Sequence, residues 1–423
     1  MLISFEAGKN ARRVLLDLKR DSYTISLDEE AVYSFDLEGR LLTAWQNDCT
    51  HIRTLDNRIV KKWREPSQRN SRKVIRELEE PEGQSVLAEV CRTAQRLFGQ
   101  LKRGEFLSTA DMSDEAWSQS ALQCLSCISE WDVARYKQEK LLFERVYSPV
   151  GILPPDQYYS LVLQATVGCH WNRCTFCNFY RDVKFHIRTP EEFLAHVRAV
   201  RAFLGKGIRL RKSIFLGDAN ALVTPQERLL AIFDLVHREF PIIGSTAPSE
   251  RPDSGPFKGI YSFLDVFTGE KKSLRDFQEL KGRNLKRVYV GIETGSDRLL
   301  KSLNKPASSA QSLEVVSAIK EAGINVGVII LAGVGGSRFY EAHVLKTIEL
   351  LNALHLGNGD LLYFSPLWDY PGGEYLRQTA EAGIRPLTEE EKRKQVAAIR
   401  SGLHFTEGRK PKFALYDIRE FIY

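Results

Sequence analysis

The sequence predicts an α/β fold built on a parallel sheet, preceded by a separate α+β domain. Strand-like and helix-like segments alternate six times after residue 158, whereas residues 1–150 show strands followed by helices. Between them lies the stretch YSPVGILPPDQY at 147–158, whose prolines can neither continue a helix nor donate to a sheet. We therefore expect a domain over 1–150, an α/β domain over 151–375 and a helical extension over 376–423.

Composition limits the class of protein. The 423-residue chain is 43% hydrophobic and 27% charged, which suits two or three folded domains and excludes a disordered chain. Its apolar stretches are far too short to span a membrane, and no apolar run precedes the first charges, so we expect a cytoplasmic protein without membrane association. The net charge of +6 is a mild bias that suits an anionic ligand and is too weak to indicate nucleic acid.

The N-terminal domain is expected to begin with strands and end with helices. Segments 32–39 and 40–45 alternate between apolar and polar residues around a Gly-Arg turn, which predicts a hairpin. A basic run at 58–76 could contact phosphates, although a solvated basic face is the more frequent role of such a run. Residues 84–103 and 113–144 have apolar positions three and four apart, which predicts helices.

The α/β domain is expected to contain six strands. They are 161–168, 213–220, 260–267, 287–293, 324–333 and 361–367. Helices are expected after them at 189–203, 224–239, 273–282, 308–322 and 340–354, with a last one from 388. Thr189 with Glu192, and Thr224 with Glu227, predict capping boxes. Right-handed crossovers make such a sheet parallel, and its functional groups gather where the strands end.

Three of the seven cysteines lie within nine residues, directly after the first of these strands. Cys169, Cys174 and Cys177 have the spacing C-x4-C-x2-C. Such crowding in an unexported chain indicates metal rather than a disulfide framework. Three thiolates on one loop can hold three irons of a [4Fe–4S] cluster and leave the fourth iron open to an external ligand. Structural zinc with His170 as fourth ligand, or three inert cysteines, are weaker alternatives, since closed zinc sites commonly use two paired motifs.

The ends of the later strands carry glycine and acidic residues. Gly217 and Asp218 end the second strand, Glu293 ends the fourth, and Gly333 and Gly335 follow the fifth. Each feature alone is common, because a Gly-Asp turn or a lone glutamate often follows a strand. Their order at successive strand ends is what indicates a site.

The cysteine triad, the aromatic Phe176 before its last cysteine, GIETGSD at 291–297 and LAGVGG at 331–336 together resemble the radical S-adenosylmethionine (SAM) enzymes. The resemblance covers about 158–375 and implies a (β/α)6 partial TIM-type barrel. Two features depart from the family pattern. The first cysteine gap has four residues where three are commonest, and Gly217 with Asp218 stands where a Gly-Gly-Glu type of motif is found.

The resemblance implies a [4Fe–4S] cluster and SAM as cofactors. In this family SAM chelates the open iron, and one electron cleaves it to methionine and a 5′-deoxyadenosyl radical, so a reductant such as a flavodoxin or ferredoxin is implied. The residues implied in SAM binding are Phe176, Gly217, Asp218, Glu293, Gly333 and Gly335. Carboxylates suit the amine and ribose hydroxyls, and glycines let the backbone approach the adenine. The substrate and the catalytic residues that act on it are not indicated.

Three further points are open from the sequence alone. The protein could be a non-catalytic iron–sulfur or zinc protein that binds nucleic acid through 58–76. The four other cysteines, Cys49, Cys91, Cys124 and Cys127, are enough for a second cluster, although cysteine in an apolar helix is usually a core residue. Finally, we expect residues 1–150 to cover the lateral opening of the partial barrel and to help bind the substrate.

Overall fold

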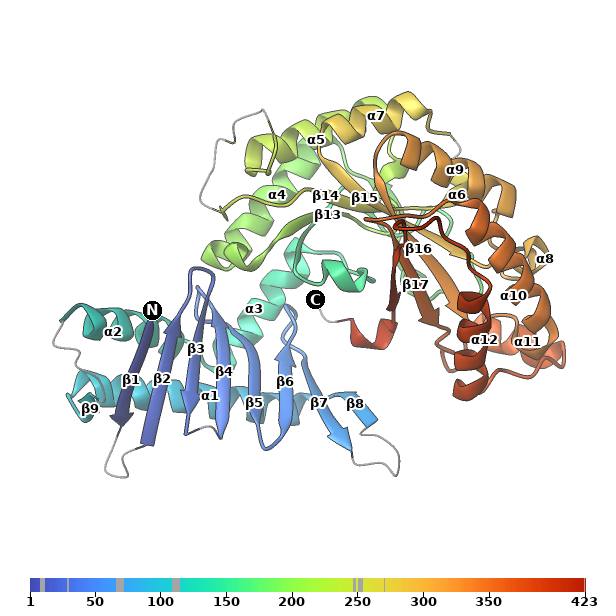
Figure 1. The fold of residues 1–423 in the computed structure, drawn as a ribbon. Helices are drawn as coiled ribbons and strands as arrows, with labels where there is room; N and C mark the ends of the chain where they lie inside the picture. The colour runs from blue at the N-terminus through green and yellow to red at the C-terminus, as the bar shows by residue number, and fades with distance from the viewer. Residues whose placement is uncertain are drawn as a thin grey trace. The chain divides into compact units, whose positions relative to one another are not determined.

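The computed structural model describes residues 1–7, 12–28, 30–65, 72–108, 115–245, 249, 254–269, 271–421 and 423 (Figure 1). Its contacts divide the chain into two compact units. Unit 1 holds Met1–Pro149, Arg198–Arg211 and Ile422–Tyr423, and unit 2 holds Val150–Val197 and Lys212–Phe421. Helix α4 (Pro190–Leu204) is therefore shared, with its first half in unit 2 and its second half in unit 1.

Unit 1 is dominated by a nine-stranded antiparallel sheet of order β8-β7-β6-β5-β4-β3-β2-β1-β9. The strands are β1 (Leu2–Ala7), β2 (Arg12–Leu18), β3 (Ser22–Leu27), β4 (Ala31–Asp36), β5 (Leu41–Gln46), β6 (Cys49–Arg53), β7 (Ile59–Glu65), β8 (Arg72–Glu77) and β9 (Phe106–Ser108). The predicted hairpin is β4–β5, and Gly39 at its turn has φ of 78°, which glycine adopts without strain. The expected α+β domain is thus mostly antiparallel sheet, because nearly every segment before residue 78 pairs with its neighbour along the chain.

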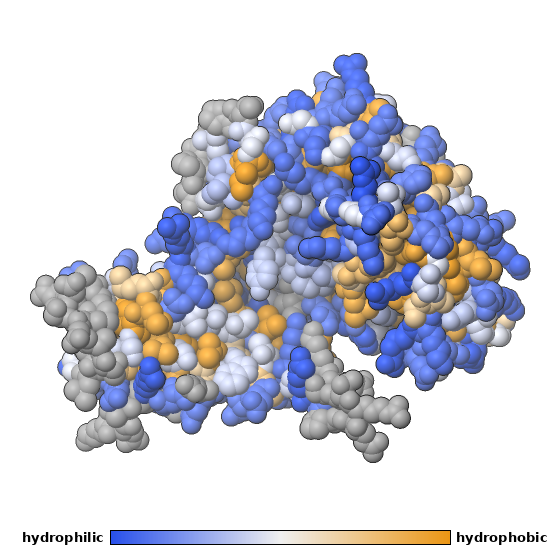
Figure 2. All heavy atoms as spheres, viewed as in Figure 1, coloured by the Kyte–Doolittle hydropathy of each residue, from blue (hydrophilic) through white to orange (hydrophobic). Residues whose placement is uncertain are grey.

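Helices cover one face of this sheet. They are α1 (Glu80–Lys102), α2 (Glu115–Ser129) and α3 (Val133–Val146). Leu87 and Val90 of α1 pack against Ile3 and Phe5 of β1 in one buried core. Alternate residues face the other way, so the opposite face carries a mixture of apolar and polar side chains (Figure 2).

The segment predicted to be helical at 113–144 is divided in two, and its residues 113 and 114 lie outside the described part. The side chain of Asp132 caps α3 by accepting a hydrogen bond from the amide of Arg135 at 2.7 Å. This cap explains the break, because an N-cap residue leaves the helical conformation. Cys91 and Cys124 lie in the apolar core of unit 1, where burial raises the pKa of Cys91 to about 12.

The basic run at 58–76 forms the edge hairpin β7–β8, and its residues 66–71 lie outside the described part. Several of its charges are neutralised locally. Arg58 contacts Asp56 and Glu77, each at 2.8 Å, and Arg76 contacts Glu82 at 2.9 Å. These exposed pairs fit the solvated face that the sequence favoured.

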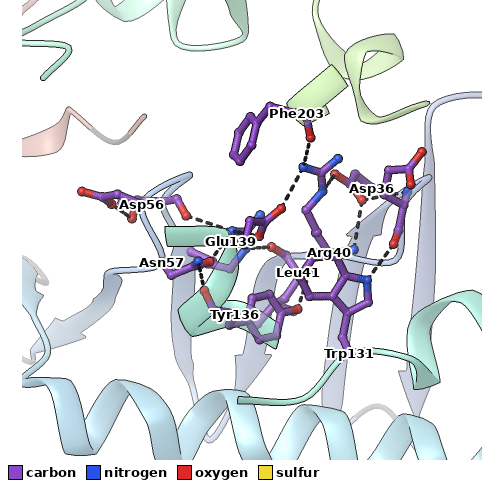
Figure 3. A network of polar contacts seen from close by, with 12 residues as sticks. Asp36, Arg40, Leu41, Asp56, Asn57, Trp131, Tyr136, Glu139 and Phe203 are labelled. Carbon is purple, nitrogen blue, oxygen red and sulfur yellow. Dashed lines mark hydrogen bonds and ion pairs between the residues drawn. The ribbon is translucent and has the colours of Figure 1, made fainter. Parts of the chain in front are cut away.

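A buried polar network joins the helices of unit 1 to the β4–β5 hairpin (Figure 3). Arg40, only 2% exposed, contacts Asp36 at 2.8 Å and Glu139 of α3 at 2.9 Å. It also donates to the carbonyl of Phe203, at the end of α4, at 2.9 Å. Arg53 approaches the second oxygen of Glu139 at 3.4 Å. The two carboxylates and two guanidinium groups therefore neutralise one another inside the unit.

Unit 2 is an α/β structure with a seven-stranded parallel sheet of order β10-β13-β14-β15-β16-β17-β18. The strands are β10 (Ser160–Gln164), β13 (Ser213–Gly217), β14 (Ile260–Leu264), β15 (Leu285–Glu293), β16 (Asn325–Ala332), β17 (Leu361–Pro366) and β18 (Lys412–Leu415). The first six were predicted, and the sheet is consistent with a partial TIM barrel. The seventh was not predicted, because its four residues have no alternation to distinguish them from a loop.

Helices follow the strands of unit 2 (Figure 1). Besides α4 they are α5 (Gln226–Glu239), α6 (Val266–Gly269), α7 (Leu274–Gly282), α8 (Asp297–Ser302), α9 (Ser309–Glu321), α10 (Gly336–Ala353), α11 (Glu374–Glu381) and α12 (Glu389–Ser401). The capping box of Thr189 and Glu192 is present, with bonds of 2.7 and 3.2 Å. The one predicted at Thr224 is wrong, because its buried hydroxyl has no hydrogen-bond partner and Pro225 precedes α5. No helix in the described ranges is long and apolar enough to cross a membrane.

The C-terminal segment links the last strands of the sheet to the chain before the first. Strand β18 extends the sheet beyond β17, and the hydroxyl of Tyr416 then donates to the carbonyl of Leu153 at 2.8 Å. Farther along, the ring of Phe421 lies 5.7 Å from that of Tyr158. This segment therefore bridges the side of unit 2 that a six-stranded sheet would leave open.

Candidate active site

A cavity of about 220 Å³ lies at the carboxyl ends of the parallel strands of unit 2. Residues at or just after five strand ends line it: Ala219, Asp265, Glu293, Leu331 and Leu367. The three clustered cysteines and Phe176 line it as well. Functional groups of parallel sheets meet at this edge, and five of the nine site residues named from the sequence are brought together here.

The cysteines lie on an excursion of the chain that is closed at its base by β11 (Thr166–Val167) and β12 (His186–Ile187). One guanidinium group holds this loop in shape. Arg181 donates to the carbonyl of Asn172 at 2.9 Å, to that of Cys177 at 3.0 Å, and to that of Cys174. Because all three carbonyls belong to one short loop, Arg181 ties together the segment that carries the thiols.

A second segment braces the loop from outside. The indole of Trp171 donates to the carbonyl of Asn304 at 2.8 Å, and the amide side chain of Asn304 donates to the carbonyl of Arg173 at 3.0 Å. The amide of Thr175 also donates to the carbonyl of Leu303 at 3.0 Å. The cysteine loop is therefore attached to the chain that follows α8.

The donor set of the loop fits an iron–sulfur cluster. Burial raises the pKa of Cys174 to about 12 and that of Cys177 to about 11, so both thiols carry protons at neutral pH until a metal displaces them. No three His, Cys, Asp or Glu side chains of the described residues converge as around a single ion. A [4Fe–4S] cluster does not require three ligands to converge on one point, because each thiolate binds a different iron.

His170, considered as a fourth zinc ligand, is engaged elsewhere. Its ring lies 5.1 Å from that of Phe267, and its Nε2 lies 3.5 Å from a carboxylate oxygen of Asp265. Burial lowers the pKa of this histidine, which favours the neutral ring. The side chain thus belongs to the packing behind the loop.

Glu293 forms a buried ion pair that the sequence did not reveal. It ends β15 with φ of 66°, and its Oε1 lies 2.7 Å from Nζ of Lys305. The two residues are 8% and 9% exposed, and both line the cavity. Burial lowers the pKa of Lys305, but Glu293 and Cys174 together raise it above its usual value, so the ammonium group stays charged. A single lysine in a loop carries no pattern by which it could have been predicted.

Asp218 is buried beside the loop rather than in the lining of the cavity. Its oxygens accept hydrogen bonds from the side chain of Gln164 at 2.9 Å and from the amide of Gly168 at 3.1 Å. Burial raises its pKa to about 7. The carboxylate therefore holds the residue directly before Cys169, and the neighbouring Gly217 lies against Val162.

Gly333 and Gly335 lie outside the thiol cavity. Their amides donate to the side chains of Gln395 and Tyr375, each at 2.8 Å. Their φ angles are 91° and 80°, and a Cβ on Gly335 would lie 2.6 Å from that of Phe339. The close packing of α10, α11 and α12 at the end of β16 accounts for both glycines in this structure.

Aromatic side chains form most of the remaining cavity wall, and sequence analysis identified only one of them. Besides Phe176 they are Phe179, Tyr180, Phe263, Trp368, Tyr370 and Tyr416. Phe263 continues into the interior of the sheet, where its ring lies 5.1 Å from Phe215 and 5.9 Å from Tyr289. Tyr416 was missed because it follows the unpredicted strand β18. The cavity is thus apolar apart from a few charged groups near the thiols.

Part of the chain is similar to known proteins. Residues 163–351 match the sequence model of the radical SAM superfamily. A segment of 177 residues is 26% identical to 4′-phospho-dehydrooxetanocin synthase of Priestia megaterium, and it covers 40% of this chain and 22% of that protein. The chain therefore spans less than a quarter of that curated relative.

Two solved structures are similar to parts of this chain. Coproporphyrinogen III oxidase of Escherichia coli, described as a radical SAM enzyme, is 13% identical, with a TM-score of 0.39 over 62% of this chain and 56% of that one. The radical SAM methyltransferase TsrM of Kitasatospora setae, solved with cobalamin and a [4Fe–4S] cluster, is 16% identical. Its TM-score is 0.39, over 53% of this chain and 39% of that one.

Proposed function

We propose that the chain is a radical SAM enzyme, because residues 163–351 match the radical SAM superfamily, and that its [4Fe–4S] cluster is bound by Cys169, Cys174 and Cys177. The observation that carries this assignment is that the three thiols line the same cavity as a buried pair of opposite charges. When bound, the cluster supplies one electron that splits SAM into methionine and a 5′-deoxyadenosyl radical. The rest of the chemistry depends on how the chain's own residues hold SAM and the substrate.

Glu293 and Lys305 are proposed to bind the polar part of SAM. The carboxylate of Glu293 and the ammonium group of Lys305 lie 2.7 Å apart. Each can bind a ligand group of opposite charge in place of the other. The amine and carboxylate of the methionine part, and the ribose hydroxyls, are such groups. Glu293, Lys305 and Cys174 line the same cavity, which supports a position of the pair beside the proposed cluster.

Phe176 is proposed to pack on the adenine. It lines the cavity between two of the cysteines and packs against a buried group that includes Leu331 and Val334 at the end of β16. This is the strand end at which the sequence resemblance puts the adenine. For Gly333 and Gly335 an adenine contact remains a prediction, and for Gly217 and Asp218 we propose that they position the cysteine loop.

The aromatic wall is proposed to receive an apolar part of the substrate. A pocket with mostly apolar walls and a few polar groups is typical of small-molecule sites, and it excludes water from a reactive centre. The comparisons give no support to the alternative of a non-catalytic protein that binds nucleic acid. The reaction carried out on the substrate is unassigned.

The test is reductive cleavage of SAM by the full chain, reconstituted anaerobically with iron and sulfide. With dithionite as reductant, we expect equal amounts of methionine and 5′-deoxyadenosine. Single Cys→Ala changes at 169, 174 and 177 should each reduce this release to background, whereas Cys49→Ala should not. Release that persists in all three loop variants would refute the assignment.

A further inference from the structure

We propose that the outer side of the cysteine loop and helix α8 together form a docking surface for a small, acidic, one-electron carrier protein. The docking surface is defined by Arg173, Arg298 and Lys301. This inference rests on the proposed function, because radical SAM enzymes need an external reductant. One electron leaves the carrier and enters the cluster, and no bond in the carrier has to form or break.

The docking surface belongs to the cysteine loop and to the segment that braces it. Arg173 is exposed and precedes Cys174 in the chain, and its guanidinium group lies 5.5 Å from the centre of the Trp171 ring. The side chain of Asn304 donates to the carbonyl of Arg173, and the amide of Asn304 donates to the carbonyl of Lys301. These contacts hold the chain at the end of α8, whose last turn carries Lys301, against the loop that carries Arg173.

The charges of the docking surface are available to a partner. Arg173, Arg298 and Lys301 are exposed, and none of them forms an ion pair with any residue that the structure describes. Arg298 and Lys301 are three positions apart in α8 and therefore share one face of the helix. The other cations nearby are committed to internal contacts, since Lys305 pairs with Glu293 and Arg181 approaches Glu374 at 3.6 Å.

Two acidic residues belong to the same segments. Asp297 accepts hydrogen bonds from the amide and hydroxyl of Ser309, and Asp182 is exposed on the loop. The three basic side chains of the docking surface therefore outnumber the two acidic side chains of the same segments. A positive patch of this kind steers an acidic partner and raises its association rate at low salt.

An electron carrier suits this surface better than a nucleic acid does. Single-stranded nucleic acid stacks its bases on open aromatic faces. Here Trp171 is contacted by Arg173 on its ring and by Phe267, with ring centres 5.8 Å apart. A redox group docked over Arg173, by contrast, would lie one residue from a cluster ligand. The position of the surface thus matches electron entry.

The experiment compares two reductants on the reconstituted full-length protein. The release of 5′-deoxyadenosine from SAM is driven either by dithionite or by a flavodoxin kept reduced with NADPH and its reductase. The variant Arg173→Glu with Lys301→Glu reverses two charges of the docking surface. The matched control, Lys258→Glu with Lys412→Glu, makes the same change in charge. Both lysines are exposed and lie at the amino ends of the parallel strands, Lys258 just before β14 and Lys412 at the start of β18.

We expect the flavodoxin-driven rate of the docking-surface variant to fall at least tenfold and to lose its dependence on salt. Its dithionite-driven rate should stay within twofold of the unchanged protein, and the control should keep both rates. The neutral variant Arg173→Gln with Lys301→Gln should show an intermediate loss. An unchanged flavodoxin-driven rate, an equal fall in the control, or a parallel fall with dithionite would each overturn the proposal.

Two further outcomes separate this proposal from others. If the unchanged protein cleaves no SAM even with dithionite, the proposed function fails and not merely the docking surface. If the charge reversal abolishes the binding of a labelled RNA oligonucleotide while the flavodoxin-driven rate is unchanged, the surface belongs to nucleic acid and the proposal is wrong.

Discussion

Arg181 holds the backbone of the cysteine loop together. Its guanidinium group donates hydrogen bonds to the carbonyls of Asn172, Cys174 and Cys177, so two of the three acceptors belong to the cysteines themselves. Sequence analysis assigned no role to Arg181, because nothing in its position indicates which carbonyls it reaches. The cysteine spacing alone identified the loop, whereas the residues that hold it needed the three-dimensional contacts.

Replacing Arg181 should therefore loosen the cluster. A hydrogen bond from a charged group contributes about 1.5–3 kcal/mol, and Arg181→Met removes three of them. We expect the reconstituted variant to lose iron to a chelator at least ten times faster and to show an altered electron paramagnetic resonance (EPR) signal. Arg181→Lys should recover part of the resistance to the chelator. The control Arg173→Lys, in the same loop, should behave as the unchanged protein, and an Arg181→Met protein that did so too would contradict the role.

Glu293 offers a second prediction at this scale. Glu293→Gln keeps the side-chain volume and an oxygen for Lys305 but loses charge-assisted hydrogen bonds worth about 1.5–3 kcal/mol each. SAM affinity, measured by calorimetry on the reconstituted protein, should fall by about one to two decades while the iron content is unchanged. Glu349→Gln, which alters an exposed pair with Lys346, is the control. Unchanged SAM binding by Glu293→Gln would make Glu293 a structural residue.

At the scale of elements, strands with a clear apolar pattern could be predicted from the sequence, whereas elements that depend on tertiary contacts could not. Strands β10 and β13 to β17 of the parallel sheet are apolar segments that alternate with helices, so the sequence pattern predicted them. Strand β18 is four residues long, and only its pairing with β17 makes it a strand. The two capping boxes had the same sequence pattern, but Thr224 is buried and its hydroxyl makes no cap to α5, which depends on tertiary packing.

Helix α10 should make stability depend on pH through one buried histidine. His343 is fully buried and lies 2.8 Å from the hydroxyl of Thr294, and burial lowers its pKa to about 4. The unfolded chain, with a pKa near 6.5, binds a proton first as the pH falls. Stability is therefore complete above about pH 6.5 and should decline by about 3 kcal/mol as the pH falls to about 4.

The measurement is the urea midpoint between pH 4.5 and pH 7.5. His343→Gln should flatten the acid side of the curve, whereas His186→Gln, at an exposed position, should leave its slope unchanged. An identical slope in the protein and in the His343→Gln variant would show that this histidine does not titrate on unfolding.

At the scale of the whole molecule, the two units are not consecutive in the sequence. Residues Arg198–Arg211 belong to unit 1, although they lie between two strands of unit 2. Sequence composition alone could not predict that this later segment belongs to the N-terminal unit. The expectation that residues 1–150 cover the barrel opening and help bind the substrate stays a prediction, while within unit 2 the segment around Tyr416 already bridges part of that side.

The polar network of unit 1 should matter for its stability. Arg40→Met leaves the buried carboxylates of Asp36 and Glu139 without their closest cation, which costs about 3–5 kcal/mol when one partner of a buried pair is removed. The control Arg58→Met breaks exposed pairs and should cost less than about 1 kcal/mol. Urea denaturation followed by tryptophan fluorescence measures both, and Trp131, whose indole donates to the carbonyl of Glu38, is one of the six tryptophans that contribute to the signal. Equal effects of the two substitutions would contradict the importance of the network.

The account depends most on the assignment of the cluster to Cys169, Cys174 and Cys177. The direct measurement is the iron and sulfide content of the anaerobically reconstituted full chain, together with its EPR spectrum after reduction. We predict that the triple Cys→Ala variant of the loop binds no cluster, whereas Cys49→Ala with Cys127→Ala keeps about four irons per chain and the unchanged signal. Full iron retention by the triple variant would place the cluster on other residues and contradict the account.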